Sequence, residues 1–433
     1  MRPQPRQARS RVWTGGSMVK AVDIGINEAE RIRNRMNGLG VVNDLHDVFD
    51  ALRRAGDVHP GGLPTLFDQP DFAFFVGFDD APRFTVIGYD SAQHVFRNHE
   101  TFSSQLYAAT AANWGPNLLM MDEPGHARYR ALAQPAFALR TMESWHDRWL
   151  LPTLERLIGA LDERERCDLY MELCARFPAH TIGAALGISE DETALVHDWI
   201  IRTATNMPKE ESEAAGANLA EFLRPIIEDR RLSPGDDLIS LLATSVLVDD
   251  DGSTHRLSDA EIMGFCGLLL IAGTGTTYRA TGILLLAVLS RPELLARIRA
   301  DRSLIPRCVE EVLRWEPPLT SFSRLVTEDT VVDGMHLPAG ALVDVGVGAA
   351  NRDPRRWHDP HRYDPLREPL AHLGFGRGPH FCMGNQLARM EMRTALELLL
   401  DRFPDIALDQ SLEAPYVTGV FFRMPTSVPV TLR

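Results

Sequence analysis

Residues 258–290 restrict the fold more than any other segment of this chain of 433 residues. Ser258 precedes Glu261 by three positions, the pattern of a capping box at the start of a helix. Apolar residues then fall on all faces of the expected helix, as in a helix buried in a core. Some thirty residues that rise about 1.5 Å each span about 45 Å, the width of a whole domain. The sequence therefore predicts a long, buried central helix.

The middle of this predicted helix is poor in helix-forming residues. Residues 272–277 read Ala-Gly-Thr-Gly-Thr-Thr. Glycine and threonine both have lower helix propensity than alanine, so we expect a role other than helix stability for this run. A membrane span is not predicted, because the apolar run 262–272 falls short of the roughly twenty residues that cross a bilayer.

Helical periodicity dominates the rest of the chain, and strand-like runs are few and short. Helices are predicted at 45–55, 92–97, 126–139, 149–161, 169–186, 191–205, 213–230 and 385–400, and strands at 84–89, 325–332 and 341–347. Length alone suggests about three domains. Because no Gly/Ser/Pro-rich linker or internal repeat divides the chain, we instead expect a single, mainly helical domain with small sheets over residues 21–433.

Charge and cysteine content narrow the classes of function. The 45 Lys and Arg against 59 Asp and Glu give a formal net charge of -14. That balance argues against nucleic-acid binding, which needs a basic face. The five scattered cysteines do not suggest a disulfide framework and fit a reducing cytoplasm. Residues 1–20 are basic and lack a signal-peptide pattern, so we expect a disordered tail, with Met1 or Met18 as the start.

A glycine-rich loop at residues 375–384 delivers Cys382 to the start of the helix predicted at 385–400. The loop reads Phe-Gly-Arg-Gly-Pro-His-Phe-Cys-Met-Gly. Amides at a helix N-terminus stabilise a thiolate and lower the thiol pKa from about 8.5. The glycines allow the backbone to approach a flat group closely. A thiolate here would be a metal ligand or a nucleophile, whereas a lone cysteine can also be a small buried apolar residue.

This loop resembles the haem-ligand loop of the cytochrome P450 family, whose pattern is Phe-Gly-x-Gly-x-His/Arg-x-Cys-x-Gly. Phe375, Gly376, His380, Cys382 and Gly384 all stand at fixed positions of the pattern. The resemblance implies that Cys382 is the axial iron ligand of haem b, iron protoporphyrin IX. It extends from about residue 40 to the end of the chain and implies the mainly α cytochrome P450 fold with a single haem domain.

Other motifs follow in the order that the family has. Glu311 and Arg314 match its Glu-x-x-Arg motif, and a spacing of three places them on one helical face. The resemblance implies that this pair is buried and joined by a second arginine, for which we expect Arg362. Taken alone, the pair would fit an ordinary surface ion pair.

Four side chains resemble the contacts that the family makes to the haem propionates. Two histidines and two arginines suit two carboxylates chemically. The set consists of His126, Arg130, Arg324 and His380. By itself, the spacing of four between the first two members also fits one face of an amphipathic helix.

The family's oxygen-activation motif on the central helix is Ala/Gly-Gly-x-Asp/Glu-Thr-Thr. The chain supplies Ala272, Gly273 and Thr276, but Gly275 stands where the acid belongs. The resemblance implies that Thr276 hydrogen-bonds the oxygen being activated, while the small residues before it leave room. The threonine hydroxyl can instead bond a helix carbonyl three or four residues back.

The missing acid matters because cleavage of the oxygen–oxygen bond consumes two protons. The nearest preceding acids on this helix, Asp259 and Glu261, lie roughly 21 Å or more away. Relay through water, a polar group on the substrate and the use of peroxide as oxidant stay open. The segments expected to line the substrate site are 102–119, 267–271, 319–322 and 418–421.

The resemblance implies a monooxygenase that inserts one atom of dioxygen into a small, largely apolar organic substrate, in secondary metabolism or catabolism. With no flavin or nicotinamide pattern in the sequence, electrons would come from a ferredoxin with its NAD(P)H-dependent reductase. Candidate docking charges are Arg128, Arg377 and Arg389, which could equally be solvated arginines. We expect a cytoplasmic monomer that binds neither nucleic acid nor a membrane.

Two other functions share these motifs. A peroxide-driven peroxygenase, or an enzyme of atypical oxidation such as desaturation or coupling, is favoured slightly by Gly275. A non-catalytic haem-thiolate sensor or electron carrier would need Cys382 but not Thr276. Product formed with peroxide alone would indicate the first, and a substrate-induced shift of the haem spectrum would count against the second.

Overall fold

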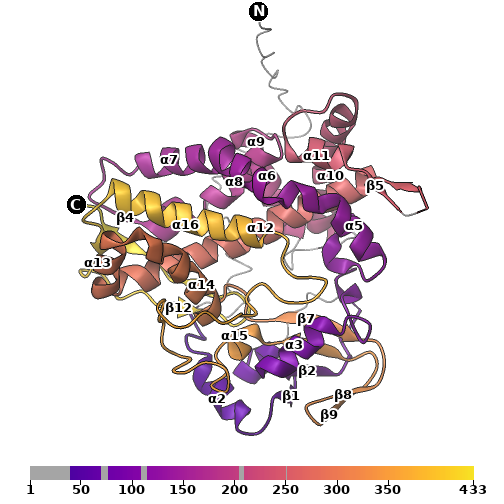
Figure 1. Ribbon diagram of the computed structural model, residues 1–433, viewed down its shortest axis with the longest axis horizontal. Helices are drawn as coiled ribbons and strands as arrows, with labels where there is room; N and C mark the ends of the chain where they lie inside the picture. Colours follow the sequence, from indigo (N-terminus) through magenta and orange to yellow (C-terminus); the bar gives the residue numbers. More distant parts are fainter. Residues whose placement is uncertain (1–39, 70–76, 109–114, 204–208, 250) are drawn as a thin grey trace, which may run out of the picture.

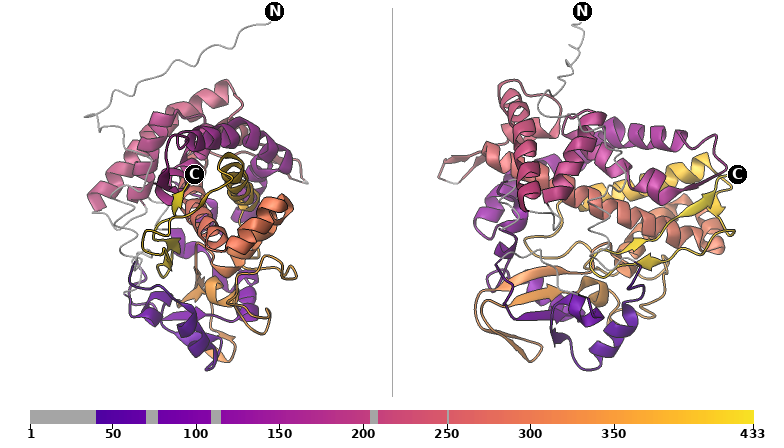
Figure 2. Two further views of the ribbon diagram at one scale, coloured as in Figure 1. Left: turned by 90° about the vertical axis from the view of Figure 1, so that its left-hand side faces the viewer. Right: turned by 180° about the vertical axis from the view of Figure 1, so that it is seen from behind.

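The computed structural model describes residues 40–69, 77–108, 115–203, 209–249 and 251–433. Helices fill the upper part of the molecule in Figure 1, and a small sheet with α2 (His46–Arg53), α3 (Tyr89–Arg97) and α15 (Val347–Ala350) forms the lower part. Figure 2 shows the same division from the side and from behind. The predicted fold class, mainly α with small sheets, is confirmed. The tail predicted at 1–20 lies outside the described residues.

The predicted central helix is α12, Asp259–Leu289. Its capping box is confirmed, because the Ser258 hydroxyl accepts from the Glu261 N–H and the Glu261 carboxylate accepts from the Ser258 N–H. The helix is long and apolar enough to cross a membrane. Most of its side chains are nevertheless buried in the protein, so core packing accounts for its apolar character. It packs against α8 (Phe177–Ala185), α10 (Lys209–Leu232), α14 (Ile305–Trp315) and α16 (Asn385–Arg402).

Two separate parts of the core meet along α12. Its first half packs with α5 (Gly125–Ala133), α6 (Leu139–Trp145), α9 (Glu190–Thr203) and α11 (Leu238–Thr244). Its second half packs with α7 (Leu151–Gly159), α13 (Pro292–Ala300), α14 and α16. Between the halves, Ala272 is exposed and Thr276 is half-buried. The run that is poor in helix formers therefore lies where one face of α12 is not covered by the core.

The main sheet has five strands in the order β1 (Val58–Pro60), β2 (Arg83–Val86), β10 (Leu342–Val345), β7 (Phe322–Val326) and β3 (Phe102–Ser103). The β2–β10 pair is parallel and the other pairs are antiparallel. Leu342 lies opposite Arg83 on one side and Leu325 on the other. β7, which lies between β10 and the edge strand β3, carries Arg324 opposite Val343 of β10.

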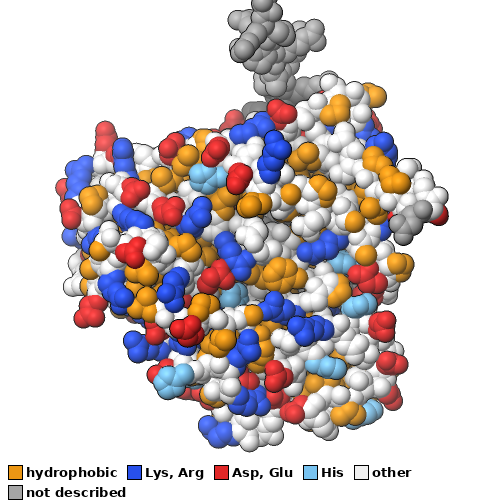
Figure 3. Space-filling view, viewed as in Figure 1, with side chains coloured by type: hydrophobic (Ala, Val, Ile, Leu, Met, Phe, Trp, Pro, Cys, Tyr) orange, Lys and Arg blue, Asp and Glu red, His pale blue; other side chains and the backbone are white. Residues whose placement is uncertain are grey.

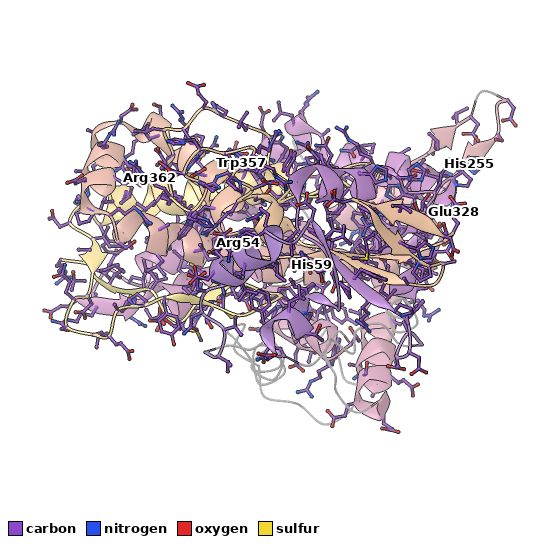
Figure 4. All side chains as sticks on the ribbon, turned by 90° about the horizontal axis from the view of Figure 1, so that it is seen from below. Arg54, His59, His255, Glu328, Trp357 and Arg362 are labelled. Atoms are coloured by element: carbon purple, nitrogen blue, oxygen red, sulfur yellow. The ribbon has the colours of Figure 1, made fainter. Side chains whose placement is uncertain are left out.

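Four smaller sheets complete the described structure. One has three strands, β11 (Ala407–Leu408), β14 (Pro429–Thr431) and β4 (Arg166–Asp168). The others pair β5 (Leu247–Val248) with β6 (Thr254–His255), β8 (Thr330–Val332) with β9 (Met335–Leu337), and β12 (Val417–Thr418) with β13 (Met424–Pro425). The β5–β6 hairpin, marked by His255 in Figure 4, projects from the body of the molecule.

Three predicted elements are divided in the structure. Residues 325–332 form the end of β7 and then β8, because β8 pairs with β9 instead of joining the main sheet. The helix predicted at 126–139 ends as α5 at Ala133 and continues as a 3₁₀ turn, Gln134–Phe137, where Pro135 has no N–H to donate. The helix predicted at 169–186 divides into a π-helical turn, Tyr170–Cys174, and α8.

Candidate functional site

Cys382 lies in a hydrogen-bonded loop that leads directly into α16. Its N–H donates to the carbonyl of Phe375 over 3.0 Å, and the N–H of Phe381 donates to the carbonyl of Gly378 over 3.0 Å. Asn385 at the start of α16 donates from Nδ2 to the carbonyl of Cys382 over 2.7 Å. These bonds fix one half-buried thiol at the entrance to a helix.

The glycines of this loop are required for different structural reasons. Gly376 and Gly378 have φ angles of 69° and 70°, in the left-handed region that favours glycine. A Cβ on Gly378 would lie 2.3 Å from the carbonyl oxygen of Phe96 in α3, so close packing requires glycine there. A Cβ on Gly376 or Gly384 would meet nothing within 4 Å. These two glycines border open space beside Cys382, as a cradle for a flat group would.

Burial controls the protonation of Cys382. Desolvation raises the pKa of the thiol, while the Gly384 N–H and the charges of Arg130 and Arg389 lower it by a smaller amount. The sequence-based expectation of a lowered pKa is therefore wrong for the protein alone, because desolvation outweighs the amides at the helix start. Coordination to a metal ion deprotonates a thiol outright.

The four predicted anion contacts come together near this loop. The rings of His126 and His380 lie 4.2 Å apart between centroids. Arg130 donates from one terminal nitrogen to the carbonyl of Pro379 over 3.1 Å. Burial, assisted by the charges of Arg324, His126 and Arg130, lowers the pKa of His380 to about 2. Two guanidinium groups and two imidazoles thus lie together beside the loop. We call these four side chains the cationic cluster.

An anionic group would satisfy this cluster. His126 Nδ1 lies 3.2 Å from Glu123 Oε1, but its Nε2 is buried with no hydrogen-bond partner among the described residues. Arg324 is only 5% exposed, and the hydrogen bond found for it goes to its neighbour, the carbonyl of Ser323, over 2.8 Å. Buried cationic and imidazole groups are normally matched by acceptors. The site therefore fits a flat group that has carboxylates at one edge, next to a thiol.

The Glu311–Arg314 pair is buried, with side chains 4% and 3% exposed. Arg314 donates from Nε and a terminal nitrogen to the two carboxylate oxygens, each over 2.8 Å. It also donates to the carbonyls of Asn351 and Pro360. The alternative of a surface ion pair is therefore wrong. The pair fastens α14 to the segment that precedes the Cys382 loop.

The second arginine on Glu311 is Arg367, and the prediction of Arg362 is wrong. Arg367 Nε donates to Glu311 Oε1 over 2.8 Å. Arg362, labelled in Figure 4, has an exposed side chain and contributes its backbone carbonyl, which accepts from both Arg314 and Arg367. Tyr363 and Pro365 of this segment are buried, and a turn in which the Arg367 N–H donates to the carbonyl of Asp364 leads Arg367 back toward Glu311. Sequence reasoning missed this turn.

Two of the three candidate docking arginines are bonded to acids. Arg128 donates to Glu261, the capping residue of α12, over 2.9 Å. Arg389 donates to Glu310 and lies over the ring of Phe375, with its Cζ 4.5 Å from the ring centroid. Arg377, half-buried within the Cys382 loop, has a buried Nε without a hydrogen-bond partner among the described residues.

The predicted oxygen-activation residues lie on α12, where Ala272 is exposed, Thr276 is half-buried and Gly275 is buried. The Thr276 hydroxyl donates to the carbonyl of Ala272, so the helix-bonded alternative holds in this structure. A Cβ on Gly273 would lie 2.7 Å from Ile182 Cδ1, which explains a small residue there. The carbonyl of Gly275 accepts from Arg279 over 2.7 Å. Arg279 follows Gly275 by one turn, a contact that sequence reasoning missed.

Several predicted wall segments present apolar side chains that are only partly buried. They are Leu268, Ile271, Leu319, Phe322 and Phe421. The segments 319–322 and 418–421 lie side by side, since the Thr320 N–H donates to the carbonyl of Phe421 over 2.9 Å and Leu319 bridges Phe422. Residues 109–114 of the first predicted segment lie outside the described residues.

Comparison with known proteins identifies the family. The family profile described as Cytochrome P450 matches residues 184–415, more than half of the chain. This chain belongs to the cytochrome P450 family. The resemblance inferred from the Cys382 loop is thereby confirmed over a much longer segment.

Its relatives are bacterial cytochrome P450 enzymes. The monooxygenase PikC of Streptomyces venezuelae is 35% identical over 75% of this chain and 79% of its own length. The vitamin D(3) 25-hydroxylase of Pseudonocardia autotrophica is 34% identical over 89% and 93%. The solved structure of CYP109Q5 from Chondromyces apiculatus has a TM-score of 0.78 and 28% identity, and covers 92% of this chain and 97% of that one.

Membership of the cytochrome P450 family confirms several predictions. The fold is the cytochrome P450 fold, and the chain is an oxidoreductase of the monooxygenase class. The cofactor of the family is haem b held through a thiolate. The cysteine, the glycine cradle and the cationic cluster fit such a group, with its carboxylates at one edge.

Proposed function

We propose that this cytochrome P450 hydroxylates or otherwise oxidises a small, largely apolar organic substrate at a haem ligated by Cys382. The observation that carries the proposal is the presence of three features together in one chain. The loop presents a thiol to a glycine-bordered cradle, the cationic cluster lies near the same loop, and α12 leaves one face uncovered. The overall reaction converts RH, dioxygen, two electrons and two protons into ROH and water.

Residues of the Cys382 loop and the nearby histidines and arginines would hold the cofactor. Cys382 would bind as the thiolate, and the Gly384 N–H, which donates to its sulfur, would moderate its basicity. Arg130, Arg324 and the two histidines would bind the carboxylates of the propionates. When bound, the haem supplies the reductive activation of dioxygen, for which the thiolate supplies electron density.

The residues that would handle dioxygen and protons lie on α12. Rotation of the Thr276 side chain away from the Ala272 carbonyl frees its hydroxyl to donate into the uncovered face and to hold a proton there. Ala272, which is exposed on α12, leaves room for a diatomic molecule beside it, whereas Gly273 packs against Ile182. The hydroxyl therefore has two uses, one inside the helix and one toward the site.

An apolar substrate suits the partly buried wall residues. Leu268, Ile271, Leu319, Phe322 and Phe421 offer mainly hydrocarbon surface, and burying such surface drives the binding of apolar ligands. Relatives include the steroid C26-monooxygenase of Mycolicibacterium smegmatis, and a related structure contains corticosterone. We propose a substrate of this size and polarity, in secondary metabolism or catabolism.

Electrons are proposed to come from a ferredoxin with an NAD(P)H-dependent reductase, in the cytoplasm. The face that carries α14 and α16 shows basic and acidic side chains interspersed (Figure 3), so no single charge sign dominates it. Arg377 lies in the Cys382 loop and is the candidate docking charge, because Arg128 and Arg389 are bonded to acids. We propose a monomer that binds neither nucleic acid nor a membrane.

A peroxide-driven peroxygenase is the second candidate, and Gly275 is the observation that favours it. An acid at this position would help deliver protons when dioxygen is the oxidant, whereas hydrogen peroxide already carries two protons. The sensor or electron-carrier alternative receives no support from relatives named as monooxygenases and hydroxylases.

The test is turnover under labelled dioxygen. The purified holoprotein would be supplied with ferredoxin, its reductase, NADPH and a panel of steroids and secosteroids. A low-to-high-spin shift with one substrate, followed by a product that carries one labelled oxygen, is the expected result. Product formed only when hydrogen peroxide is added, with no label from dioxygen, would overturn the monooxygenase proposal in favour of the peroxygenase. Cys382→Ser is the inactive control.

A further inference from the structure

A buried arginine joins the predicted oxygen-activation residues of α12 to a predicted wall of the substrate site. Arg279 is 0% exposed. It donates from one terminal nitrogen to the carbonyl of Gly275 over 2.7 Å. Its Cζ lies 4.5 Å from the ring centroid of Tyr278 and 4.5 Å from that of Phe422. One guanidinium group therefore contacts both α12 and a segment far from it in the sequence.

That distant segment is the connection between β12 and β13, which carries two adjacent aromatic rings. Phe422 is buried, and the half-buried wall residue Phe421 meets it edge to face, with ring centroids 4.8 Å apart. The carbonyl of Phe421 accepts from the Thr320 N–H, and Phe422 bridges Leu319 of the other predicted wall segment. The ring that Arg279 contacts therefore supports a ring of the wall.

The hairpin of β12 and β13 also packs closely on α12. β13 contacts this helix, and a Cβ on Gly282 of α12 would lie 3.0 Å from Pro425 Cγ of β13. Gly282 follows Arg279 by three positions, which places both on one face of the helix. Close packing at Gly282 and the guanidinium contact at Arg279 thus fix the hairpin on α12 at two points.

Packing alone does not account for an arginine at position 279. Burial of a guanidinium group costs free energy, which hydrogen bonds and contacts with aromatic faces offset. A planar guanidinium can stack on rings and donate hydrogen bonds from its edge at the same time. Methionine would fill the space as a flexible apolar side chain, but it could not hold a carbonyl oxygen and two rings in one orientation.

The carbonyl that Arg279 binds belongs to the part of α12 that is poor in helix formers. Residues 272–277 contain two glycines, which lower helix stability relative to alanine. The Thr276 hydroxyl bonds within the same run, so the backbone of this run determines where the hydroxyl lies. A side-chain hydrogen bond to the carbonyl of Gly275 helps to hold that backbone in place.

We propose that Arg279 is a positioning residue that fixes the wall at Phe421 relative to Thr276 and so determines which carbon of the substrate is oxidised. This inference rests on the proposed monooxygenase function. A substrate that packs on the Phe421 ring is held at a set distance from Thr276, because Arg279 binds the preceding residue of α12 and contacts the ring behind the wall. Loss of this link lets the wall shift, and the substrate then binds in more than one orientation.

The test compares Arg279→Met with a matched control, Arg291→Met. Arg291, just after the end of α12, donates to the carbonyl of Ala287 over 2.7 Å. Its Cζ lies 5.5 Å and 5.0 Å from the ring centroids of Trp315 and Tyr363. None of these partners belongs to the predicted wall or to residues 272–277. Both variants therefore lose the same kinds of contact, but in different places.

The first readout is the binding of two iron ligands to the purified holoprotein. Imidazole and 4-phenylimidazole both bind haem iron through nitrogen, and the second adds a ring whose binding depends on apolar walls. The wild type should prefer 4-phenylimidazole. Arg279→Met should reduce this preference by about 5-fold, the worth of one aromatic contact, with the affinity for imidazole unchanged. Arg291→Met should keep the wild-type preference.

The second readout is the set of products. With ferredoxin, reductase and each panel steroid that the wild type oxidises, Arg279→Met should spread oxidation over additional carbons, whereas Arg291→Met should not. Arg279→Lys keeps the charge but loses the planar group, so it should resemble Arg279→Met. If these variants do not fold, Phe422→Leu removes the ring that Arg279 contacts and carries the same expectation.

The outcomes separate the two proposals. An unchanged ligand preference and unchanged products in an Arg279→Met variant that keeps its thiolate spectrum would overturn the positioning role and leave the proposed function intact. Equal losses of preference in Arg279→Met and Arg291→Met would also overturn the positioning role, because the effect would then be general destabilisation. A wild-type protein without a thiolate spectrum would overturn both proposals.

Discussion

At the scale of single residues, the geometry of the site is set by the hydrogen-bond partners of each side chain. Cys382 is held by backbone hydrogen bonds, and burial keeps its thiol protonated until a metal binds. Glu311 is satisfied by two arginines and the N–H of Asp364. Which arginine is the second partner of Glu311 depends on which residues of the irregular segment before the Cys382 loop face the core. Motif spacing identified Glu311 and Arg314 correctly and Arg367 not at all.

Replacing Arg367 should therefore destabilise the protein, whereas replacing Arg362 should not. Arg367→Ala removes a charge-assisted hydrogen bond to a buried carboxylate, which costs about 2 kcal/mol. Arg362→Ala removes an exposed side chain and should change the unfolding free energy by less than about 0.5 kcal/mol. Chemical denaturation of both variants, together with their haem content, measures the difference. A larger loss for Arg362→Ala would contradict the assignment.

The loop glycines offer a second matched pair. Gly376→Ala places a Cβ in open space, so only the left-handed backbone is penalised, at about 1 kcal/mol. Gly378→Ala adds a clash with the backbone of α3, so its loss should reach about 3 kcal/mol. Urea unfolding of the two variants without haem checks this order, because bound haem would fill the space beside Gly376. Equal losses would show that contact with Phe96 does not constrain the loop.

At the scale of elements, α14 and α16 are joined beside the Cys382 loop by Glu310. Its carboxylate accepts from Arg389 of α16 and bonds His372, which precedes the loop. Partial burial opposes ionisation, but these two partners prevail and lower the pKa of Glu310 to about 2. The link between the two helices therefore depends on an ionised carboxylate.

Acid should weaken this link. Because the folded-state pKa is depressed, the stability that Glu310 contributes is fully present above the unfolded value of about 4.5 and is lost as the pH falls toward 2. The difference in unfolding free energy between the wild type and Glu310→Gln should shrink over that range. Glu310 is partly exposed, so solvent keeps the effect small. A difference that grows with acidity would contradict the ion-pair account.

The elements also show how far the sequence predicts the fold. Residues 258–290 were expected as one helix and form α12, because apolar content, cap and length all agree. The prediction of one strand at 325–332 was wrong. β8 pairs with β9 and not with the main sheet, and the alternation of apolar residues along the chain does not determine which strands pair. Motif spacing predicted four side chains that the structure places together near the Cys382 loop, whereas the burial of Glu391 within a predicted helix could not be told from the spacing.

At the scale of the whole molecule, the proposed electron transfer would bring this acidic protein together with a ferredoxin, and an acidic ferredoxin would carry charge of the same sign. The net charge of -14 opposes that encounter. Local basic groups near the Cys382 loop must outweigh the overall repulsion at short range. Among the three candidate arginines, only Arg377 has no acidic partner among the described residues.

Arg377→Gln should weaken ferredoxin binding by about 2- to 5-fold at low salt, as expected for one partly screened charge. The effect should fade near 1 M salt, where the Debye length falls to about 3 Å. Arg362→Gln, which removes an exposed arginine outside the loop, is the control and should bind like the wild type. Binding titrations over a range of salt concentrations measure both. Equal affinities of all three proteins at low salt would exclude Arg377 from the docking surface.

The most direct measurement of the central claim is the carbon-monoxide spectrum of the reduced holoprotein. Thiolate ligation by Cys382 predicts a Soret band at clearly longer wavelength than that of imidazole-ligated haem, and Cys382→His should move the band to the imidazole position. A freshly purified wild-type protein whose band already lies at the imidazole position would contradict the assignment of Cys382 as the haem ligand.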